Sequence, residues 1–387
     1  MSLDPTLSTL TIALLVLAIG LALSFEFVNG FHDTANAVAT VIYTHSLPPM
    51  VAVIWSGLWN FIGVLTSSGA VAFAVVQLLP VDLVLNVGSG AGFAMVFALL
   101  VSAIMWNAGT WYLGLPASSS HTLIGAILGV GLANSLLDAQ VTGSGVNWGQ
   151  ARNVGASLLI SPVIGFVCTA LLFLLLKKTV HKPILYRPPE GKAPPPPWIR
   201  AVLCLTCTGV SFAHGSNDGQ KGMGLILLIV IGLAPASFAL KMDADAAAIN
   251  TLAANTAQLS ADFAPPPGTA PLPAKSAVTL LEKYVSGDAA PDATTTNALA
   301  FFCGDISARL KNVKTLYDVP TGERGHLRMD LYLASAVLGK LAKAPEKVAQ
   351  PAKSAAAGDF RRSALSLTEY IPIWIKAMVA VALGLGT

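Results

Sequence analysis

Long apolar segments separated by short polar ones make up most of this chain. A run of about 20 apolar residues is long enough to cross a lipid bilayer as an α-helix. Because no basic segment precedes the first run, we expect that run to be a membrane span and not a cleaved signal peptide. The pattern therefore predicts an all-α polytopic membrane protein. The expected spans lie near residues 8–28, 50–79, 91–113, 117–136, 153–176, 201–215, 222–238 and 370–387.

Residues 239–369 have a different composition. They contain 27 of the chain's 43 charged side chains, 14 basic and 13 acidic, and are rich in Ala, Thr and Pro. Apolar positions recur at helical spacing in residues 274–287 and 325–343. The pattern predicts a small, loosely packed helical insert that lies in water between membrane segments.

The overall composition excludes several classes of protein. Of 387 residues, 54% are apolar and only 11% are charged, where soluble domains carry roughly 25% charge. The mean hydropathy is +0.67 and the net charge is +3. These values exclude a disordered chain, a nucleic-acid binder and an ordinary soluble enzyme. Cys204 and Cys207 lie inside an apolar run without a second cysteine pair, so no metal site is expected there.

Charge near the middle of the chain suggests an orientation. Residues 177–200 contain six Lys and Arg and end in four prolines and WIR, which indicates a stiff cytoplasmic linker. Five crossings before it place the N-terminus outside. The same count places the insert in the periplasm of a bacterial host, although Arg152 then lies on the outer side.

Four ionisable residues are expected at membrane depth: Glu26, Asp33, Asp218 and Lys221. Such residues are costly in a bilayer and are candidates for a functional site. For Glu26, a packing role beside a polar neighbour is as strong an interpretation as a role in coupling. Lys221 would either contact a substrate anion or pair with Asp218 or Glu26.

A short motif occurs twice with an offset of 185 residues. FVNGFHD at 27–33 matches FAHGSND at 212–218 in its phenylalanine, glycine and aspartate. Two copies separated by an odd number of crossings have opposite orientations, which is typical of secondary transporters. The expected order is a first transmembrane repeat (1–176), the linker (177–200), the start of a second transmembrane repeat (201–238), the insert (239–369) and a further transmembrane segment of that repeat (370–387).

We expect both copies to contain a broken or re-entrant helix, at Gly30 and at Gly215. Residues 8–45 as one helix would be roughly 57 Å long, whereas the hydrocarbon core is about 30 Å thick. A break would direct free N–H groups toward an anion. The adjacent carboxylate would supply oxygen ligands for a cation or a site for a proton.

A third polar element, GLPASSSHTLIGAILGVG, spans residues 114–131. We expect Pro116 to begin a helix whose first turn holds Ser118, Ser119 and Ser120, a suitable cradle for an oxyanion. The serines would also serve as N-caps, and both roles can hold together. The histidines beside the motifs are candidates for a proton relay, or for structural hydrogen bonds: His32, His121 and His214.

Three segments resemble the Pit family of inorganic phosphate transporters: GFHDTANAVATVIYTHSLPP at 30–49, GLPASSSHTLIGAILG at 114–129 and SFAHGSNDGQKGMGLI at 211–226. The likeness covers most of residues 20–240 and is strongest to the bacterial low-affinity branch. The resemblance implies a multi-pass protein of the bacterial inner membrane that imports phosphate by cation symport. It favours the proton over Na⁺ as the coupling ion, and phosphate travels free or as a complex with a divalent metal.

The roles known in the family are expected at the positions of this sequence that match its motifs. The resemblance implies that Asp33, Asn36, Asn217 and Asp218 hold the coupling cation or proton. The groups expected to reach phosphate are Thr34, Ser118, Ser119, Ser120, Gln220 and Lys221. It implies no resident cofactor or metal and no nucleic-acid partner; the partners are phosphate and membrane lipid, with a homodimer as an open alternative.

Other functions are also considered. A hydrolase using Ser119 or Ser120 with His121 is disfavoured because neighbouring residues on a helix do not face each other. Transport of another tetrahedral oxyanion, such as sulfate, is an alternative. The family has a second PxSTTH-like element late in its second repeat, and none follows Asp218 here. We therefore expect the second repeat to be incomplete, through a truncated frame, a split gene or a fragment that is inactive alone.

Overall fold

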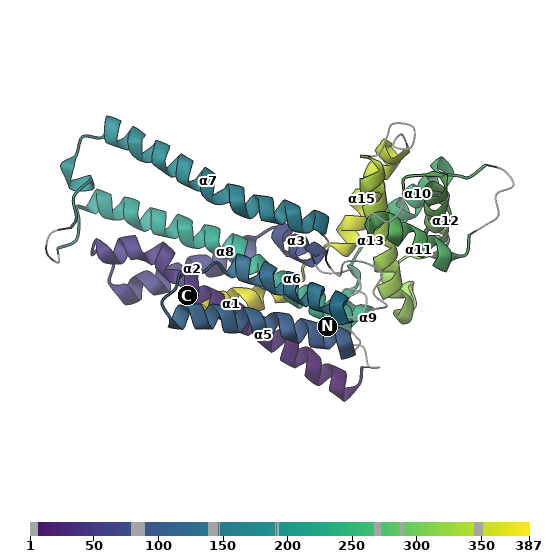
Figure 1. The fold of residues 1–387 in the computed structure, drawn as a ribbon, viewed down its shortest axis with the longest axis horizontal. Coiled ribbons are helices and arrows are strands. Elements are labelled where there is room, and N and C mark those ends of the chain that lie inside the picture. Colours follow the sequence, from purple (N-terminus) through teal and green to yellow (C-terminus); the bar gives the residue numbers. More distant parts are fainter. Residues whose placement is uncertain are drawn as a thin grey trace. The chain divides into compact units, whose positions relative to one another are not determined.

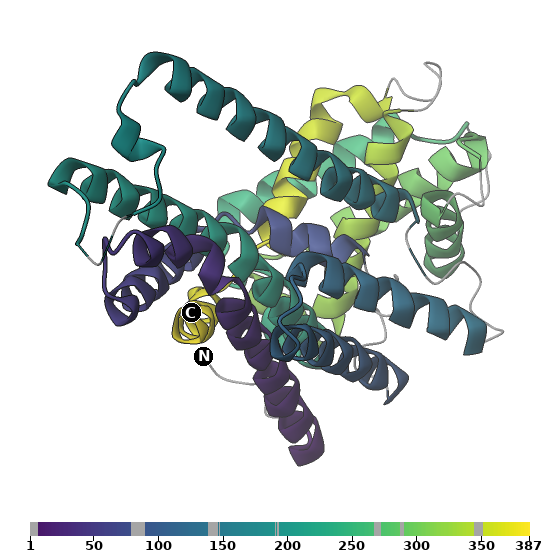
Figure 2. The ribbon, with the colours of Figure 1, turned by 60° about the vertical axis from the view of Figure 1, so that its left-hand side comes forward.

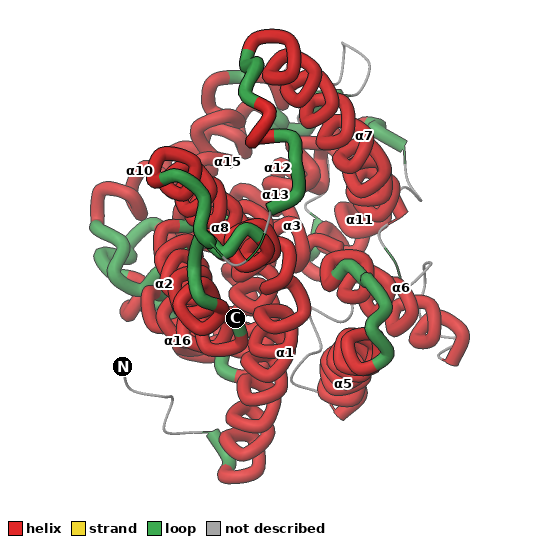
Figure 3. Tube along the Cα trace, turned by 90° about the vertical axis from the view of Figure 1, so that its left-hand side faces the viewer, coloured by secondary structure: helices red, strands yellow, loops and turns green. Residues whose placement is uncertain are grey.

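The computed structural model describes residues 7–78, 90–137, 146, 148–189, 191, 193–266, 272–286, 290–343 and 351–387. Across these ranges the regular structure is helical, with no strand (Figure 3). The chain forms two compact units. Ile12–Ile229 and Ile371–Thr387 make up one, here called the membrane unit, and Val230–Tyr370 form most of the other, called the insert unit.

Long apolar helices dominate the membrane unit (Figure 1). Five of them, in the part of the chain that the structure describes, are long and apolar enough to cross a bilayer: α1, α2, α5, α6 and α7. They correspond to the first five predicted spans and confirm a polytopic membrane protein. The helices of this unit are α1 (Thr9–Tyr43), α2 (Pro49–Thr66), α3 (Ala70–Leu78), α5 (Gly90–Tyr112), α6 (Ser119–Leu137), α7 (Trp148–Thr179), the 3-10 turn η1 (Pro183–Leu185), α8 (Pro197–Leu233) and α16 (Ile373–Gly386).

The predicted breaks at Gly30 and Gly215 are wrong. Gly30 lies inside the continuous 35-residue helix α1, and Gly215 lies inside the 37-residue helix α8. Both glycines instead allow another helix to come close. A Cβ on Gly30 would lie 2.5 Å from the Leu383 carbonyl oxygen of α16, and one on Gly215 would lie 2.7 Å from Cα of Asn60 on α2. Small residues permit such close helix contacts in membranes.

The chain leaves helical geometry at other points of the membrane unit. The predicted span 50–79 is divided into α2 and α3 by residues 67–69, where Gly69 has a φ of 90°; residue 79 lies outside the described residues. Conversely, the segments 201–215 and 222–238 are joined in α8, which is followed by the short α9 (Pro235–Phe238). Helix continuity therefore follows from the neighbours of each segment and not from glycine content.

Helix α16 packs against both α1 and α2 (Figure 2). The contact uses glycines on both sides, because a Cβ on Gly57 would lie 2.7 Å from the Gly384 carbonyl oxygen. At the other end of α16, the Lys376 ammonium donates to the Ser67 carbonyl at 2.7 Å, at the C-cap of α2. A cation at that position interacts favourably with the helix dipole.

Helix α7 shows how the membrane unit meets lipid. None of its most apolar window is buried in the protein, and large side chains such as Leu159, Phe166 and Leu171 are exposed. Lys177 and Lys178 lie in the last turn of the helix. An apolar helix with largely exposed side chains is stable in lipid, because its backbone groups are hydrogen-bonded within the helix.

The insert unit is a bundle with its own core, so the expectation of loose packing is wrong. Helices α11 and α13 confirm the helical spacing predicted for 274–287 and 325–343. Phe302 and Phe360 are among its fully buried side chains. Asp245, Asp292 and Ser354 cap helices by accepting backbone hydrogen bonds. The main helices are α10 (Ala246–Asp262), α11 (Ala274–Ser286), α12 (Ala293–Leu310), α13 (Arg324–Leu341) and α15 (Ala355–Thr368).

One buried cation connects the two ends of this bundle. The Arg328 guanidinium donates to the Ala239 carbonyl oxygen at 2.9 Å and to the Thr368 carbonyl oxygen. Burial lowers the pKa of Arg328 to about 10. Its main contacts are backbone oxygens, so its role here is structural: it joins the start and the end of the insert.

Candidate functional site

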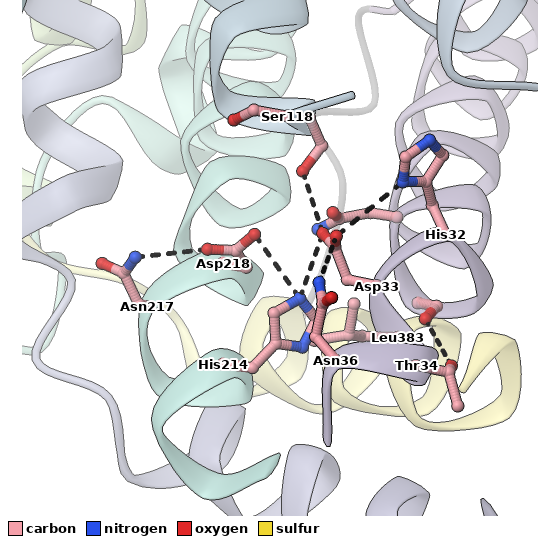
Figure 4. Close-up of polar contacts among 12 residues, drawn as sticks. His32, Asp33, Thr34, Asn36, Ser118, His214, Asn217, Asp218 and Leu383 are labelled. Carbon is pink, nitrogen blue, oxygen red and sulfur yellow. Dashed lines mark hydrogen bonds and ion pairs between the residues drawn. The ribbon is translucent and has the colours of Figure 1, made fainter. Parts of the chain in front are cut away.

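The two repeat-related aspartates meet inside the membrane unit. His214 Nε2 on α8 lies 3.5 Å from Asp33 Oδ2 on α1 and 3.5 Å from Asp218 Oδ2 on α8 (Figure 4). The side chains of Asp33 and Asp218 are 17% and 14% exposed. Carboxylates that are 185 residues apart in sequence therefore share one largely buried site.

Lys221 and Ser119 extend this site to a third helix. The Lys221 ammonium is 2.6 Å from Asp218 Oδ2 and donates to Ser119 Oγ at 3.1 Å. Ser119 Oγ in turn donates to Asp33 Oδ2 at 3.5 Å. Lys221 and Ser119 are 3% and 1% exposed, and a buried ammonium needs such partners.

The start of α6 is placed differently from the expectation. Pro116 lies outside the helix, which begins at Ser119 after a non-helical stretch. Ser118 is the cap, because its hydroxyl accepts from the His121 backbone N–H at 3.4 Å. Ser119 therefore occupies the first position of the helix, where N–H groups have no intrahelical acceptor. Ser120 is half-buried beside it.

Two exposed amides hold the outer oxygens of the aspartates. Asn36 Nδ2 donates to Asp33 Oδ1 at 3.3 Å, and Asn217 Nδ2 donates to Asp218 Oδ1 at 3.2 Å. His32 Nδ1 lies 3.7 Å from Asp33 Oδ1. The predicted cation residues are therefore gathered around the two carboxylates.

Two predicted phosphate residues point to other partners. The Thr34 hydroxyl lies 2.7 Å from the Gly30 carbonyl oxygen and 3.0 Å from that of Thr387. The Gln220 side chain donates to the Ser216 carbonyl at 2.6 Å and accepts from the Val71 N–H, in the first turn of α3, at 2.8 Å. Their contact with phosphate stays a prediction.

Sequence reasoning missed Asn60. Its Oδ1 lies 2.8 Å from His214 Nδ1, and its Nδ2 donates to the Thr387 hydroxyl at 3.1 Å. Asn60 is 1% exposed. It thus positions the imidazole that contacts both aspartates. The available signal was a carboxamide inside the apolar run of α2, which a search limited to ionisable residues does not detect.

Glu26 lies near this site but outside its hydrogen-bonded set. It is fully buried on α1, accepts from Asn29 Nδ2 at 3.3 Å and packs against the backbone of Gly222 on α8. A Cβ on Gly222 would come within 2.7 Å of Glu26 Oε1. Glu26 forms no ion pair with Lys221 within 4 Å.

The donor set suits an anion beside a cation. Asp33, His214 and Asp218 each present one ligand atom, and these atoms lie within 4.8 Å of one another. The Lys221 ammonium already contacts the Asp218 oxygen that faces His214. Across the site, the start of α6 supplies hydroxyls and N–H groups, which bind oxyanions without a fixed charge of their own.

Comparisons with known proteins agree with this chemistry. The chain is 40% identical to the low-affinity inorganic phosphate transporters PitA and PitB of Escherichia coli K12; each match covers 97% of this chain and 77% of the relative. It is 35% identical to a probable low-affinity inorganic phosphate transporter of Bacillus subtilis, over 56% of this chain and 60% of that protein. No solved structure matches the chain.

The relatives are transporters, which removes the hydrolase alternative. The model of the phosphate transporter family matches residues 29–387, from within the first motif to Thr387. With that match and the identity across nearly its whole length, this multi-pass membrane protein belongs to the phosphate transporter family.

Proposed function

We propose that this protein imports inorganic phosphate across a bacterial inner membrane by symport with a cation, and that the cation is a proton. The observation that carries the proposal is the single buried site in which Asp33 and Asp218 meet Ser119 and Lys221. His214 and His32 adjoin the carboxylates, and imidazoles exchange protons in the physiological range. The PitA and PitB relatives support phosphate as the substrate.

Phosphate binds at the start of α6 in this proposal. The N–H groups of the first turn and the hydroxyls of Ser119 and Ser120 donate hydrogen bonds to its oxygens. Lys221 contributes positive charge from α8, since its ammonium has a third proton beyond those directed at Asp218 and Ser119. An arginine is not required at this position, because the ammonium group of a lysine also donates hydrogen bonds to phosphate oxygens.

The coupling cation or proton binds on the aspartate side of the site. Asp33 is held by Asn36 and faces His214, and Asp218 is held by Asn217. A cation next to phosphate offsets the cost of removing each charge from water, which is far larger for a lone buried ion. The same arrangement accommodates phosphate bound to a divalent metal.

Transport then follows by alternating access. The two repeats, α1 with its neighbours and α8 with its neighbours, rock against each other around the occupied site. Entry of both ions from outside and release of both into the cytoplasm couples phosphate uptake to the cation gradient. A homodimer is compatible with this scheme, which needs only one chain.

The test uses the purified chain in proteoliposomes under separate H⁺ and Na⁺ gradients. We expect the H⁺ gradient to drive uptake of labelled phosphate, and Asp33→Asn and Asp218→Asn each to abolish it. Asp359→Asn is the control because this carboxylate lies in an exposed ion pair with Arg362 in the insert. Gradient-driven uptake that persists in both aspartate variants would contradict the proposal.

Two additions to this assay separate the finer alternatives. Excess sulfate should leave phosphate uptake unchanged, and equal competition by sulfate would show a general carrier of tetrahedral oxyanions. Removal of Mg²⁺ with a chelator should reduce uptake if phosphate travels as a metal complex. Uptake driven only by the Na⁺ gradient would show that the coupling cation is Na⁺ and not the proton.

A further inference from the structure

The two copies of the motif differ at several positions, and one of them is the residue that donates to each aspartate from three positions further along the helix. With the 185-residue offset, Asp33 corresponds to Asp218, and Asn36 corresponds to Lys221. Each of these partners is three residues after its aspartate on the same helix, and each donates to that aspartate. The first copy thus presents a neutral amide where the second presents an ammonium.

The contacts of the two partners are also different. Asn36 is exposed and donates at 3.3 Å, whereas Lys221 is 3% exposed and lies 2.6 Å from Asp218 Oδ2. The Lys221 ammonium is further held by Ser119, so it is fixed between α8 and α6. A cation is therefore already in place at Asp218, whereas the basic groups within 4 Å of Asp33 in the described part of the chain are the imidazoles of His32 and His214, which are charged only when protonated.

A second cation at Asp218 is disfavoured by this arrangement. The oxygen that Lys221 contacts is the one that faces His214 and, across the imidazole, Asp33. A mobile cation at that oxygen would lie beside the ammonium, and like charges repel strongly in a site largely shielded from water. Asp33 and His214 remain as the groups that can exchange a cation. Glu26, the other nearby carboxyl, forms no ion pair with Lys221 within 4 Å and so does not draw the ammonium away from Asp218.

We propose that the Lys221 ammonium is a built-in cation that replaces one exchangeable coupling cation at the second motif, so that only the Asp33 side exchanges its cation in each transport cycle. This inference rests on the proposed function as a cation-coupled phosphate carrier. It concerns how many cations move with each phosphate and which residue sets that number. The chain would obtain a positive charge beside phosphate without taking it from the gradient.

The experiment measures the coupling number in proteoliposomes. At equilibrium, the logarithm of the phosphate accumulation ratio rises with the imposed cation gradient, and the slope gives the number of cations per phosphate. The slope is measured under H⁺ and Na⁺ gradients, separately and together. We expect Lys221→Asn, which copies the first motif, to raise the total slope by one cation per phosphate. We expect the conservative Lys221→Arg to keep the wild-type slope.

The reciprocal variant tests the same idea from the other side. Asn36→Lys places an ammonium three residues after Asp33, at a position that is exposed in the structure, and its folding is checked by size-exclusion chromatography. We expect the slope of phosphate accumulation against the cation gradient to fall by one cation per phosphate in this variant. Exchange of internal for external phosphate should continue. If Lys221→Asn does not fold, as judged by size-exclusion chromatography, Asn36→Lys decides the question.

The outcomes distinguish this inference from the proposed function. Absence of phosphate accumulation by the wild-type protein under every gradient would overturn both. Accumulation by the wild-type protein with an unchanged slope in Asn36→Lys, or in a folded Lys221→Asn, would overturn only the built-in cation. In particular, weaker phosphate binding with an unchanged slope in Lys221→Asn would assign Lys221 to phosphate alone.

Discussion

Residues 29–36 on α1 and residues 214–221 on α8 share a glycine, an aspartate and a donor at the same spacing, but their aspartates have different neighbours. Asp218 is neutralised by a lysine on its own helix. Asp33 is held by an exposed amide and lies near two histidines. The comparison teaches that a duplicated motif can keep its geometry while one copy supplies a fixed charge and the other leaves its charge to be satisfied by an exchangeable ion.

The largest expected difference between the copies is in stability. Asp218→Asn leaves the buried Lys221 without its carboxylate, and breaking a buried pair costs about 3–5 kcal/mol. Asp33→Asn leaves no buried lysine, so we expect it to unfold close to wild type although both variants lose uptake. Thermal unfolding in detergent checks this, and Asp218→Asn combined with Lys221→Gln should recover most of the lost stability. Equal destabilisation by the two single variants would show that Lys221 is not the charge partner of Asp218.

The next largest losses of stability are expected from substitutions of the glycines in the two motifs. Gly30→Ala and Gly215→Ala each place a methyl group against the backbone of a neighbouring helix, and overpacking of this kind costs about 1–3 kcal/mol. The matched controls are Gly20→Ala on α1 and Gly209→Ala on α8, since a Cβ at either position meets nothing within 4 Å. Both controls should be neutral or stabilising by about 0.5–1 kcal/mol. The same unfolding assay ranks the four variants, and a stable Gly215→Ala would contradict the close contact with Asn60.

The histidine contacts should produce a smaller effect, on transport. Asn60→Leu removes the 2.8 Å partner of His214, which adjoins both aspartates. A lost buried hydrogen bond costs about 1–3 kcal/mol, so we expect uptake to fall by about tenfold. Thr110→Val removes the longer 3.3 Å contact of His32, which adjoins Asp33 alone, and should cost less. Initial rates of phosphate uptake rank the two variants. A larger loss of uptake in Thr110→Val than in Asn60→Leu would contradict the greater role assigned to His214.

The smallest effects are expected from the exposed amides. Asn36→Ala and Asn217→Ala each remove one hydrogen bond to a carboxylate that keeps other partners. Hydrogen bonds open to solvent contribute at the low end, about 0.5 kcal/mol, so uptake should change only two- to threefold. Asn36→Ala should have the larger effect, because Asp33 lacks the ammonium that Asp218 retains. Equal rates for both variants would indicate that the two aspartates are equally well held.

The sequence predicted more of the site's membership than of its geometry. Asp33, Asp218 and Lys221 were identified because an ionisable residue in an apolar run is costly and therefore conspicuous. Ser119 was one of three equivalent serines, and the structure alone shows that it is the one that contacts Lys221 and Asp33. Asn60 was overlooked because a carboxamide carries no charge, and the candidates at membrane depth were chosen by charge.

The glycines give the clearest case of a local rule that failed. The breaks at Gly30 and Gly215 were predicted from length, because residues 8–45 as one helix would be roughly 57 Å long and the hydrocarbon core is about 30 Å thick. In the structure each glycine lies where another helix backbone comes close, α16 for Gly30 and α2 for Gly215. Packing against a neighbour therefore accounts for both residues, while α1 and α8 continue through them.

By itself, the sequence determined the helical class, the first five membrane spans, the separate insert and the pair of aspartates. These follow from the length of apolar runs and the cost of charge in lipid, which are properties of a segment alone. Only the tertiary structure decided which helices meet, that His214 lies between the aspartates and that Lys221 is fixed beside one of them. In a bilayer, apolar faces look alike whether they contact lipid or protein, so hydropathy does not record the partners of a helix; close packing and paired polar groups select them.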